Sequence, residues 1–278
     1  MLRVAVSRDA RVVAIVLAWV PAVLLLDRPA TLLEQRALGL LTWLLLLALL
    51  RGESALVRVQ TLVVVVFATV IEYAFSDALG VYVYRLENVP WFVPPGHGLV
   101  YLAAYGFGRS AFARRHARAL IGGTVAVGGA YAIWGMSPLA PRTDVLGAFW
   151  FLCLVGFVWL GRSRLLYVGA FMVVTYLEVL GTAMGTWTWQ AHDFTGLVPM
   201  GNPPSGAAGG YGWFDLVAVA AAPWLLARLA EQRADARRAS KERNATIDTL
   251  ASLVGQQSEH LVVDVAVRRQ EVAALERG

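Results

Sequence analysis

The sequence predicts an all-α membrane protein whose helices cross the bilayer about eight times. Hydrophobic residues make up 58% of the 278 residues, and charged residues only 15%. Soluble domains carry about 25% charged residues, so this chain is too apolar for an aqueous fold. Eight apolar stretches have roughly the 17–25 residues that a transmembrane helix needs. These stretches are residues 10–26, 31–50, 55–76, 91–108, 118–136, 144–161, 164–184 and 211–230.

The first and fourth stretches need separate interpretation. The first has Arg3, Arg8 and Arg11 before or at its start, as in a signal peptide, but Asp27-Arg28-Pro29 after it is a poor cleavage site. We therefore expect a retained helix. The fourth stretch contains Pro94 and Pro95 in its first turns. Prolines are tolerated at a helix start, so this helix is expected to begin near Gly96.

The arginines beside the apolar stretches predict the orientation, because cytoplasmic loops carry the excess of basic residues. With the N-terminus inside, eleven of these arginines lie on the inner side and four on the outer side. The inner set is Arg3, Arg8, Arg11, Arg51, Arg58, Arg109, Arg114, Arg115, Arg118, Arg162 and Arg164; the outer set is Arg28, Arg36, Arg85 and Arg142. We therefore expect a multi-pass protein of the cell membrane with both termini in the cytoplasm.

A motif that occurs twice predicts that the transmembrane domain, residues 1–230, consists of two halves, about 1–110 and 111–230. An internal repeat sets the architecture of a chain. Both copies follow a helix that runs in the same direction, so we expect two parallel repeats of four helices. The first copy contains Thr69, Glu72, Gly80, Tyr82, Tyr84, Val89-Pro90 and Pro94-Pro95, and the second contains Thr175, Glu178, Gly185, Trp187, Trp189, Val198-Pro199 and Pro203-Pro204.

Residues 231–278 differ from the rest and predict a cytoplasmic amphipathic helix. Eight basic residues are balanced by eight acidic ones, which argues against binding to nucleic acid. Ile247, Leu250 and Val254 recur at helical spacing. This tail is interpreted as a solubilising extension that offers a surface for a homo-oligomer or for a cytoplasmic partner.

Glu72 and Glu178 are the leading catalytic candidates, because each lies inside an apolar stretch. A carboxylate inside the hydrocarbon costs roughly 2.5–3.5 kcal/mol even on lenient scales, so such acids are functional by default. Burial favours the protonated form, which can donate a proton. Thr69 and Thr175 lie one helical turn before each Glu and are expected to hydrogen-bond it. The alternative is that each Glu is a structural link to the other half.

His97 and Asp215 are the other catalytic candidates. His97 follows the first Pro-Pro pair, and an imidazole there is either a proton shuttle or an ordinary interfacial residue. Asp215 opens the eighth apolar stretch, where an acid also complements the helix dipole. Asp77 lies five residues past Glu72 near the end of its helix, where solvent is the simpler interpretation.

Aromatic and small residues complete the predicted site. The alternation in Tyr82-Val83-Tyr84 and Trp187-Thr188-Trp189 places the rings of an extended segment on one face, which suits the wall of a slot. Residues 201–212, rich in Gly and Ala, are a flexible lid, a close backbone approach to a ligand, or a disordered loop. The predicted substrate-binding residues are Tyr82, Tyr84, Trp91, Trp187, Trp189, Asn202 and Trp213.

Around these residues the chain resembles the carotenoid-biosynthesis membrane family that includes the CruF-type carotenoid 1,2-hydratases and bisanhydrobacterioruberin hydratase. Glu72, Gly80 to Tyr84 and Val89-Pro90 match its first element. Trp187 to Trp189, Pro199, Asn202 and Trp213-Phe214 match its second element in order. Pro94 to Gly98 and the Gly/Ala-rich segment after Pro204 depart from the family pattern. The resemblance implies acid-catalysed addition of water to a C=C bond of a carotenoid end group.

The leading hypothesis is therefore a membrane enzyme that acts on a long isoprenoid or other lipid. Glu72 is the expected acid, and Glu178 or His97 the expected base. A lipid-binding or transport protein that uses the same acids is the second hypothesis, and a scaffold acting through its tail is the third. The sequence has no zinc-ligand spacing, phosphate loop or nucleophile elbow, so no cofactor and no metal are expected.

Overall fold

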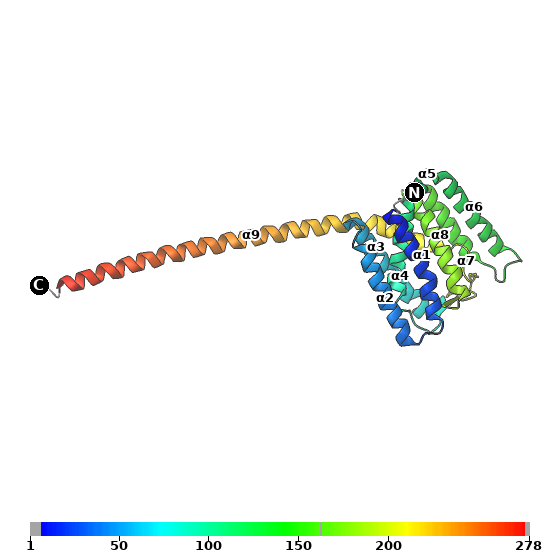
Figure 1. The fold of residues 1–278 in the computed structure, drawn as a ribbon, viewed down its shortest axis with the longest axis horizontal. Coiled ribbons are helices and arrows are strands. Elements are labelled where there is room, and N and C mark those ends of the chain that lie inside the picture. Colours follow the sequence, from blue (N-terminus) through cyan, green and yellow to red (C-terminus); the bar gives the residue numbers. More distant parts are fainter. Residues whose placement is uncertain (1–6, 162, 276–278) are drawn as a thin grey trace, which may run out of the picture. The chain divides into compact units, whose positions relative to one another are not determined.

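The computed structural model describes residues 7–161 and 163–275, and these residues are mostly helical (Figure 1). Two of the arginines used to predict orientation, Arg3 and Arg162, lie outside the described residues. All eight predicted stretches are helical. The bounds of the first seven lie within a few residues of those expected, whereas the eighth is part of a helix that continues to Leu275. The elements are α1 (Arg8–Asp27), α2 (Leu32–Leu50), α3 (Ala55–Glu72), η1 (Tyr73–Ala78), β1 (Tyr82–Tyr84), α4 (Val93–Gly108), α5 (Ala111–Arg115), α6 (Ala117–Met136), α7 (Val145–Leu160), α8 (Arg164–Ala183), β2 (Trp187–Trp189) and α9 (Ala207–Leu275).

Six of the described helices are long and apolar enough to cross a membrane: α1, α2, α3 with η1, α6, α8 and α9. This set is that of a multi-pass membrane protein. The helices α4 and α7 have 16 residues each and are shorter than a typical spanning helix. Most of α4 is buried, including His97, Tyr101 and Ala104, which places it inside the bundle.

Local sequence explains where several helices begin. Ser7 and Ser54 cap α1 and α3 by accepting a backbone N–H, and Thr31 with Glu34 forms a capping box at the start of α2. Pro94 and Pro95 lie in the first turn of α4, where a missing N–H costs nothing. The helix therefore begins at Val93, slightly before the expected Gly96.

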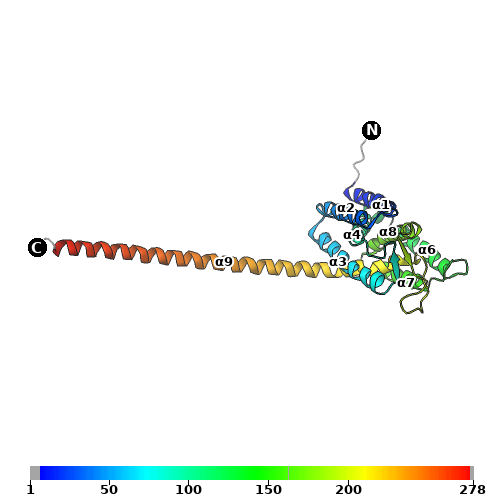
Figure 2. The ribbon, with the colours of Figure 1, turned by 90° about the horizontal axis from the view of Figure 1, so that it is seen from below.

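The helices α4 and α8 form the centre of the bundle. The first contacts α1, α2, α3 and α8, and the second contacts α1, α4, α6 and α7. Figure 2 shows both between the N-terminal helices and the pair α6 and α7. Gly169 of α8 lies so close to α4 that a Cβ would stand 2.5 Å from the carbonyl oxygen of Ala104. Small residues thus let the two central backbones approach closely.

The short strands β1 and β2 lie at one end of the bundle, which is called the strand end below. They pair antiparallel, with Tyr82 opposite Trp189 and Tyr84 opposite Trp187. Gly80 and Gly185 precede the strands with φ of 59° and 73°, a conformation that glycine adopts without strain. The glycine of each motif copy therefore makes the same backbone reversal.

The Gly/Ala-rich residues 201–212 are not a lid, because half of them belong to α9 and pack against α7. A Cβ at Gly206 would stand 2.1 Å from the carbonyl oxygen of Gly147, and one at Gly209 only 1.8 Å from that of Trp150. The close approach is thus to a neighbouring helix. The eighth stretch accordingly begins at Ala207, four residues earlier than predicted.

Contacts divide the chain into two units, Met1–Pro223 and Trp224–Gly278; the sequence-based boundary lies at residues 230 and 231. The described part of the second unit is helical. Ile247 and Leu250 are exposed there, and the side chain of Val254 is outside the described set.

Candidate functional site

The two strands bring four aromatic side chains onto one buried face. Tyr82, Tyr84, Trp187 and Trp189 are each 5–7% exposed, whereas Thr188 between the tryptophans is exposed. The ring centroids of Tyr82 and Trp189 are 4.5 Å apart across the strands, and those of Tyr84 and Trp187 are 6.1 Å apart. The alternation read from the sequence is thus a pair of strands, one from each motif copy.

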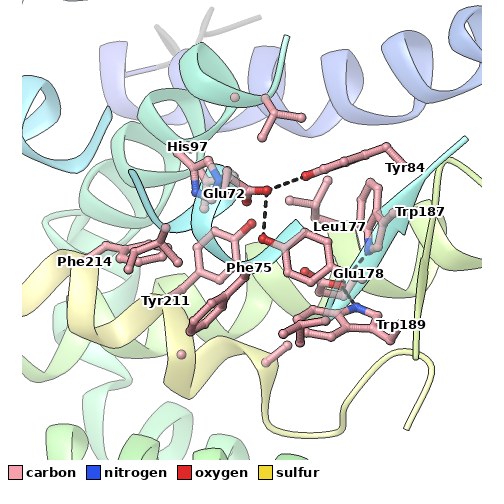
Figure 3. Close-up of a pocket in the computed structure, with 18 of the residues that line it drawn as sticks. Glu72, Phe75, Tyr84, His97, Leu177, Glu178, Trp187, Trp189, Tyr211 and Phe214 are labelled. Atoms are coloured by element: carbon pink, nitrogen blue, oxygen red, sulfur yellow. Dashed lines mark hydrogen bonds and ion pairs between the residues drawn. The ribbon is translucent and has the colours of Figure 1, made fainter. Parts of the chain in front are cut away.

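Glu72, the last residue of α3, accepts three hydrogen bonds inside the protein (Figure 3). The hydroxyls of Tyr82 and Tyr84 donate to its Oε2 at 2.8 and 2.7 Å. Nε2 of His97 lies 2.8 Å from Oε1. A carboxylate only accepts, so Nε2 carries the proton in this pair. Both oxygens of Glu72 are therefore engaged.

The phenols of Tyr82 and Tyr84 stay protonated in this position. Burial raises the pKa of both well above their ordinary value, and the neighbouring Glu72 raises it further. Each phenol therefore acts as a hydrogen-bond donor to the carboxylate. Three hydrogen-bond donors thus converge on the carboxyl group of Glu72.

Glu178 of α8 is also buried, but its donors differ. The indole N–H groups of Trp187 and Trp189 both donate to Oε2, at 3.0 and 3.1 Å. No hydrogen bond reaches Oε1 from the part of the chain that the structure describes. A neutral carboxylic acid matches this pattern, since its carbonyl oxygen accepts both indoles and its hydroxyl on the other oxygen remains free to donate.

Both acids line one cavity of about 490 Å³, in the range of about 300–1,000 Å³ typical of ligand sites. Its walls come from both halves of the chain and are mainly aliphatic and aromatic. Figure 3 shows the side chains of Glu72 and Glu178 directed toward its interior. The walls include Val20, Leu24, Phe67, Phe75, Phe92, Trp150, Leu177, Tyr211, Trp213 and Phe214, besides the four strand aromatics and His97.

The cavity also reaches residues at the protein surface. Trp213 and Phe194 line it and are 48% and 62% exposed. Asp193, beside Phe194, accepts backbone N–H groups of Val198 and Leu197. The hydrogen bond from Val198 contributes most to lowering the pKa of Asp193, so this exposed acid stays ionised at neutral pH. The rim thus combines exposed aromatic rings with one negative charge.

Most of the predicted site residues line this cavity, but three of them do not. Trp91 does not line the cavity; it is 47% exposed and packs under the guanidinium of Arg36 at 5.4 Å. Asn202 fixes β2 instead of contacting the cavity, because its Oδ1 accepts the backbone N–H of Trp189. Asp215 is buried, but it is not among the lining residues.

Asp215 lies one residue beyond the wall residue Phe214, on a different face of α9. Phe214 packs with Tyr101 of α4, and Tyr101 is fully buried. The hydroxyl of Tyr101, Oδ2 of Asp215 and Oε1 of Gln60 are buried without a hydrogen-bond partner among the described atoms. A direct catalytic role of Asp215 in the cavity is therefore not supported.

The expected partner of Glu72 was also misassigned. Thr69 donates its hydroxyl to the carbonyl of Val65 at 2.6 Å, as hydroxyls inside helices commonly do. The true donors come from the strand that follows. Sequence reasoning identified these aromatic residues as walls but missed that their O–H and N–H groups hold the two acids. The similar spacing was the available signal, since Glu72 precedes Tyr82 by ten residues and Glu178 precedes Trp187 by nine.

Four wall residues were not singled out by the sequence or were given no role. Phe75, Trp150 and Phe214 line the cavity, and Tyr211 stacks on His97 with ring centroids 5.0 Å apart. Phe75 lies inside the first motif copy but is not repeated in the second, and Trp150 lies on a helix without a motif, so no local signal marked them. Tyr211 and Phe214 are placed by the packing of α9, which single-sequence patterns do not specify.

Comparison with protein-family models, with curated proteins and with solved structures gave no match. Within the described residues, no group of three or more His, Cys, Asp or Glu side chains could hold a metal ion.

Proposed function

We propose that the chain is an integral membrane enzyme that adds water to a C=C bond of an isoprenoid, with a carotenoid end group as the specific substrate class. The observation that carries this proposal is the presence of two buried carboxyl groups with different donors in one aromatic cavity. The resemblance to carotenoid hydratases around Glu72 and Trp187 supports the substrate class. The volume of about 490 Å³ suits the end of a long chain.

Glu178 is the proton donor in this proposal. Glu178 lines the cavity and its Oε1 receives no hydrogen bond from the described residues, while the two indoles on Oε2 stabilise the carboxylate that remains after proton transfer. This assignment reverses the roles expected from the sequence, in which Glu72 was the acid. The reason is that both oxygens of Glu72 are already occupied by donors.

Glu72 and His97 form the anionic side of the site. The ionised Glu72 stabilises positive charge that develops on the substrate, and its fixed donors keep it oriented without reorganisation during the reaction. It is also the base that takes a proton from the attacking water. His97 is a positioning residue, because it acts through Oε1 of Glu72.

The proposed reaction balances without a further reactant. The π electrons form a C–H bond with the proton of Glu178, which leaves a tertiary carbocation on the neighbouring carbon. An oxygen lone pair of water forms the C–O bond, and Glu72 takes the released proton. That proton must then return to Glu178, so the net reaction adds one water molecule to the double bond.

The finer topology belongs to the same proposal. We propose eight spans in two parallel repeats, α1 to α4 and α6 to α9, with the strand end at the outer face of the cell membrane. Both termini, including the tail, are then cytoplasmic. The equivalent places of Glu72 and Glu178, and of Gly80 and Gly185, support the repeat. The inner excess of arginine supports the orientation.

Lipid and pigment analysis tests the proposed function. The full chain is expressed in cells that make acyclic carotenoids, and membrane insertion is verified by immunoblotting of the membrane fraction. The expected result is a product heavier than its precursor by one water, with a tertiary hydroxyl at the chain end. Correctly inserted protein that leaves every isoprenoid unchanged would contradict the proposal.

A further inference from the structure

The buried carboxyl group of Glu72 is held without an arginine. Two other buried acids do have arginine partners: Arg85 lies 3.5 Å from Asp27, and Arg8 and Arg109 both pair with Glu53. Glu72 receives only phenol and imidazole donors. Among the described residues that line the cavity, none is Lys or Arg. The carboxyl group of Glu72 thus has no Lys or Arg partner among the described residues that line the cavity.

Aromatic rings surround the same carboxyl group. Tyr82 and Tyr84 are in edge contact with centroids 5.9 Å apart, and Trp189 lies 4.5 Å from Tyr82. His97 stacks on Tyr211 and meets Phe214 edge-on at 5.5 Å. Aromatic faces attract cations, most strongly where water is excluded. A fixed carboxylate and several ring faces in one apolar chamber therefore favour a ligand with a positive charge on an apolar body.

We propose that this cavity binds lipophilic ammonium ions, in which an alkylated nitrogen is attached to an isoprenoid or alkyl chain. The inference rests on the proposed function for one point, namely that the charge sits where the carbocation would form. A trialkylated nitrogen and a tertiary carbocation share their charge and their apolar substituents. The ammonium ion should therefore occupy the site as a stable mimic of the reaction intermediate.

Phenol hydrogen bonding strengthens this preference. Tyr82 and Tyr84 donate their protons to Glu72, which holds their rings in place beside the carboxylate. Because these hydrogen bonds hold both rings in place, binding needs little reorganisation. A neutral chain of equal shape gains the same apolar burial but neither the carboxylate nor the cation–π attraction.

A matched pair of ligands tests the proposal. Geranyl trimethylammonium is compared with its uncharged tert-butyl analogue, in which carbon replaces nitrogen. The full chain is reconstituted in lipid nanodiscs, and binding is followed by the fluorescence of the tryptophans and by thermal shift, with empty nanodiscs as the partition control. We expect the cation to bind about tenfold or more tightly than the neutral analogue. Equal affinities in the wild-type protein would overturn the inference without any variant.

Two variants locate the charge. Glu72→Gln should remove most of the preference for the cation, whereas Asp77→Asn, which neutralises an exposed acid five residues later, should keep it. A preference that persists in folded Glu72→Gln protein contradicts the inference. The outcomes also separate the two proposals. If the protein prefers the cation but forms no hydrated product, the proposed function is contradicted and the inference stands. If it forms the hydrated product but shows no preference for the cation, only the inference is contradicted.

Discussion

The two motif copies place a glutamate at the same point of two helices and then treat it differently. The first copy surrounds Glu72 with two phenols and an imidazole, and so engages both carboxyl oxygens. The second copy offers Glu178 two indoles on one oxygen only. Tyrosine in one strand and tryptophan in the other thus give a repeated acid two different sets of hydrogen-bond donors. In the proposed mechanism, this difference lets a duplicated framework supply an acid and an anion to one cavity.

Glu178→Gln is expected to have the largest effect on this comparison. Glutamine keeps the carbonyl oxygen that accepts both indoles but cannot transfer a proton. General acid catalysis contributes typically about 100- to 10,000-fold, so kcat should fall by that range while the protein remains folded. The rate of product formation in membranes measures it. Asp77→Asn is the matched control and should retain full activity.

Activity of Glu178→Gln near the wild-type level would show that the proton comes from another group. Activity of Glu72→Gln near the wild-type level would contradict the assignment of Glu72 as the anion and the base.

His97→Gln is expected to have a smaller effect. It weakens a hydrogen bond to a charged carboxylate, which is worth roughly 1.5–3 kcal/mol, so kcat should fall about 10- to 100-fold. The substrate KM should change little, because His97 acts through Glu72. Steady-state measurement of kcat and KM in the variant and the wild-type protein tests whether kcat falls while KM stays the same. A change confined to KM would indicate that His97 only shapes the cavity.

Gly181→Ala tests the surroundings of Glu178, the acid of the second motif copy, and should have the smallest effect on activity. A Cβ at this position would lie 1.9 Å from the ring of Trp187, so the indole must move away from Glu178. Loss of one neutral hydrogen bond costs about 0.5–1.5 kcal/mol, and activity should fall a few-fold to tenfold. Tryptophan emission should shift at the same time. Gly122→Ala meets no atom within 4 Å and is the control; equal behaviour of the two variants would exclude this role of Gly181.

The sequence predicted the helices well because apolar length and cap residues are local signals. All eight stretches are helical, and the two strands follow from the alternating aromatics. The shared cavity required tertiary packing, which brings α4 and α8 together and pairs β1 with β2. Helical periodicity alone suggested Thr69 as the partner of Glu72. The observed donors lie ten and twelve residues away, beyond the reach of that reasoning.

The failed assignments have a common physical origin. Trp91 and Asn202 lie in loops at the strand end, where the direction of a side chain depends on the helix or strand that it contacts. Trp91 packs beside Gly39 of α2, and Asn202 turns back to the backbone of β2. Asp215 differs from Tyr211 by one helical turn, yet only Tyr211 lines the cavity. Composition and spacing do not encode these choices.

Infrared spectroscopy tests the central claim most directly, because the carbonyl stretch of a protonated carboxylic acid is distinct from that of a carboxylate. Spectra of the wild-type chain in nanodiscs at neutral pH are compared with those of Glu178→Gln and Glu72→Gln. We predict that the protonated-acid absorption contains a component that disappears in Glu178→Gln and persists in Glu72→Gln. A component that disappears in Glu72→Gln instead, with none lost in Glu178→Gln, would contradict the account.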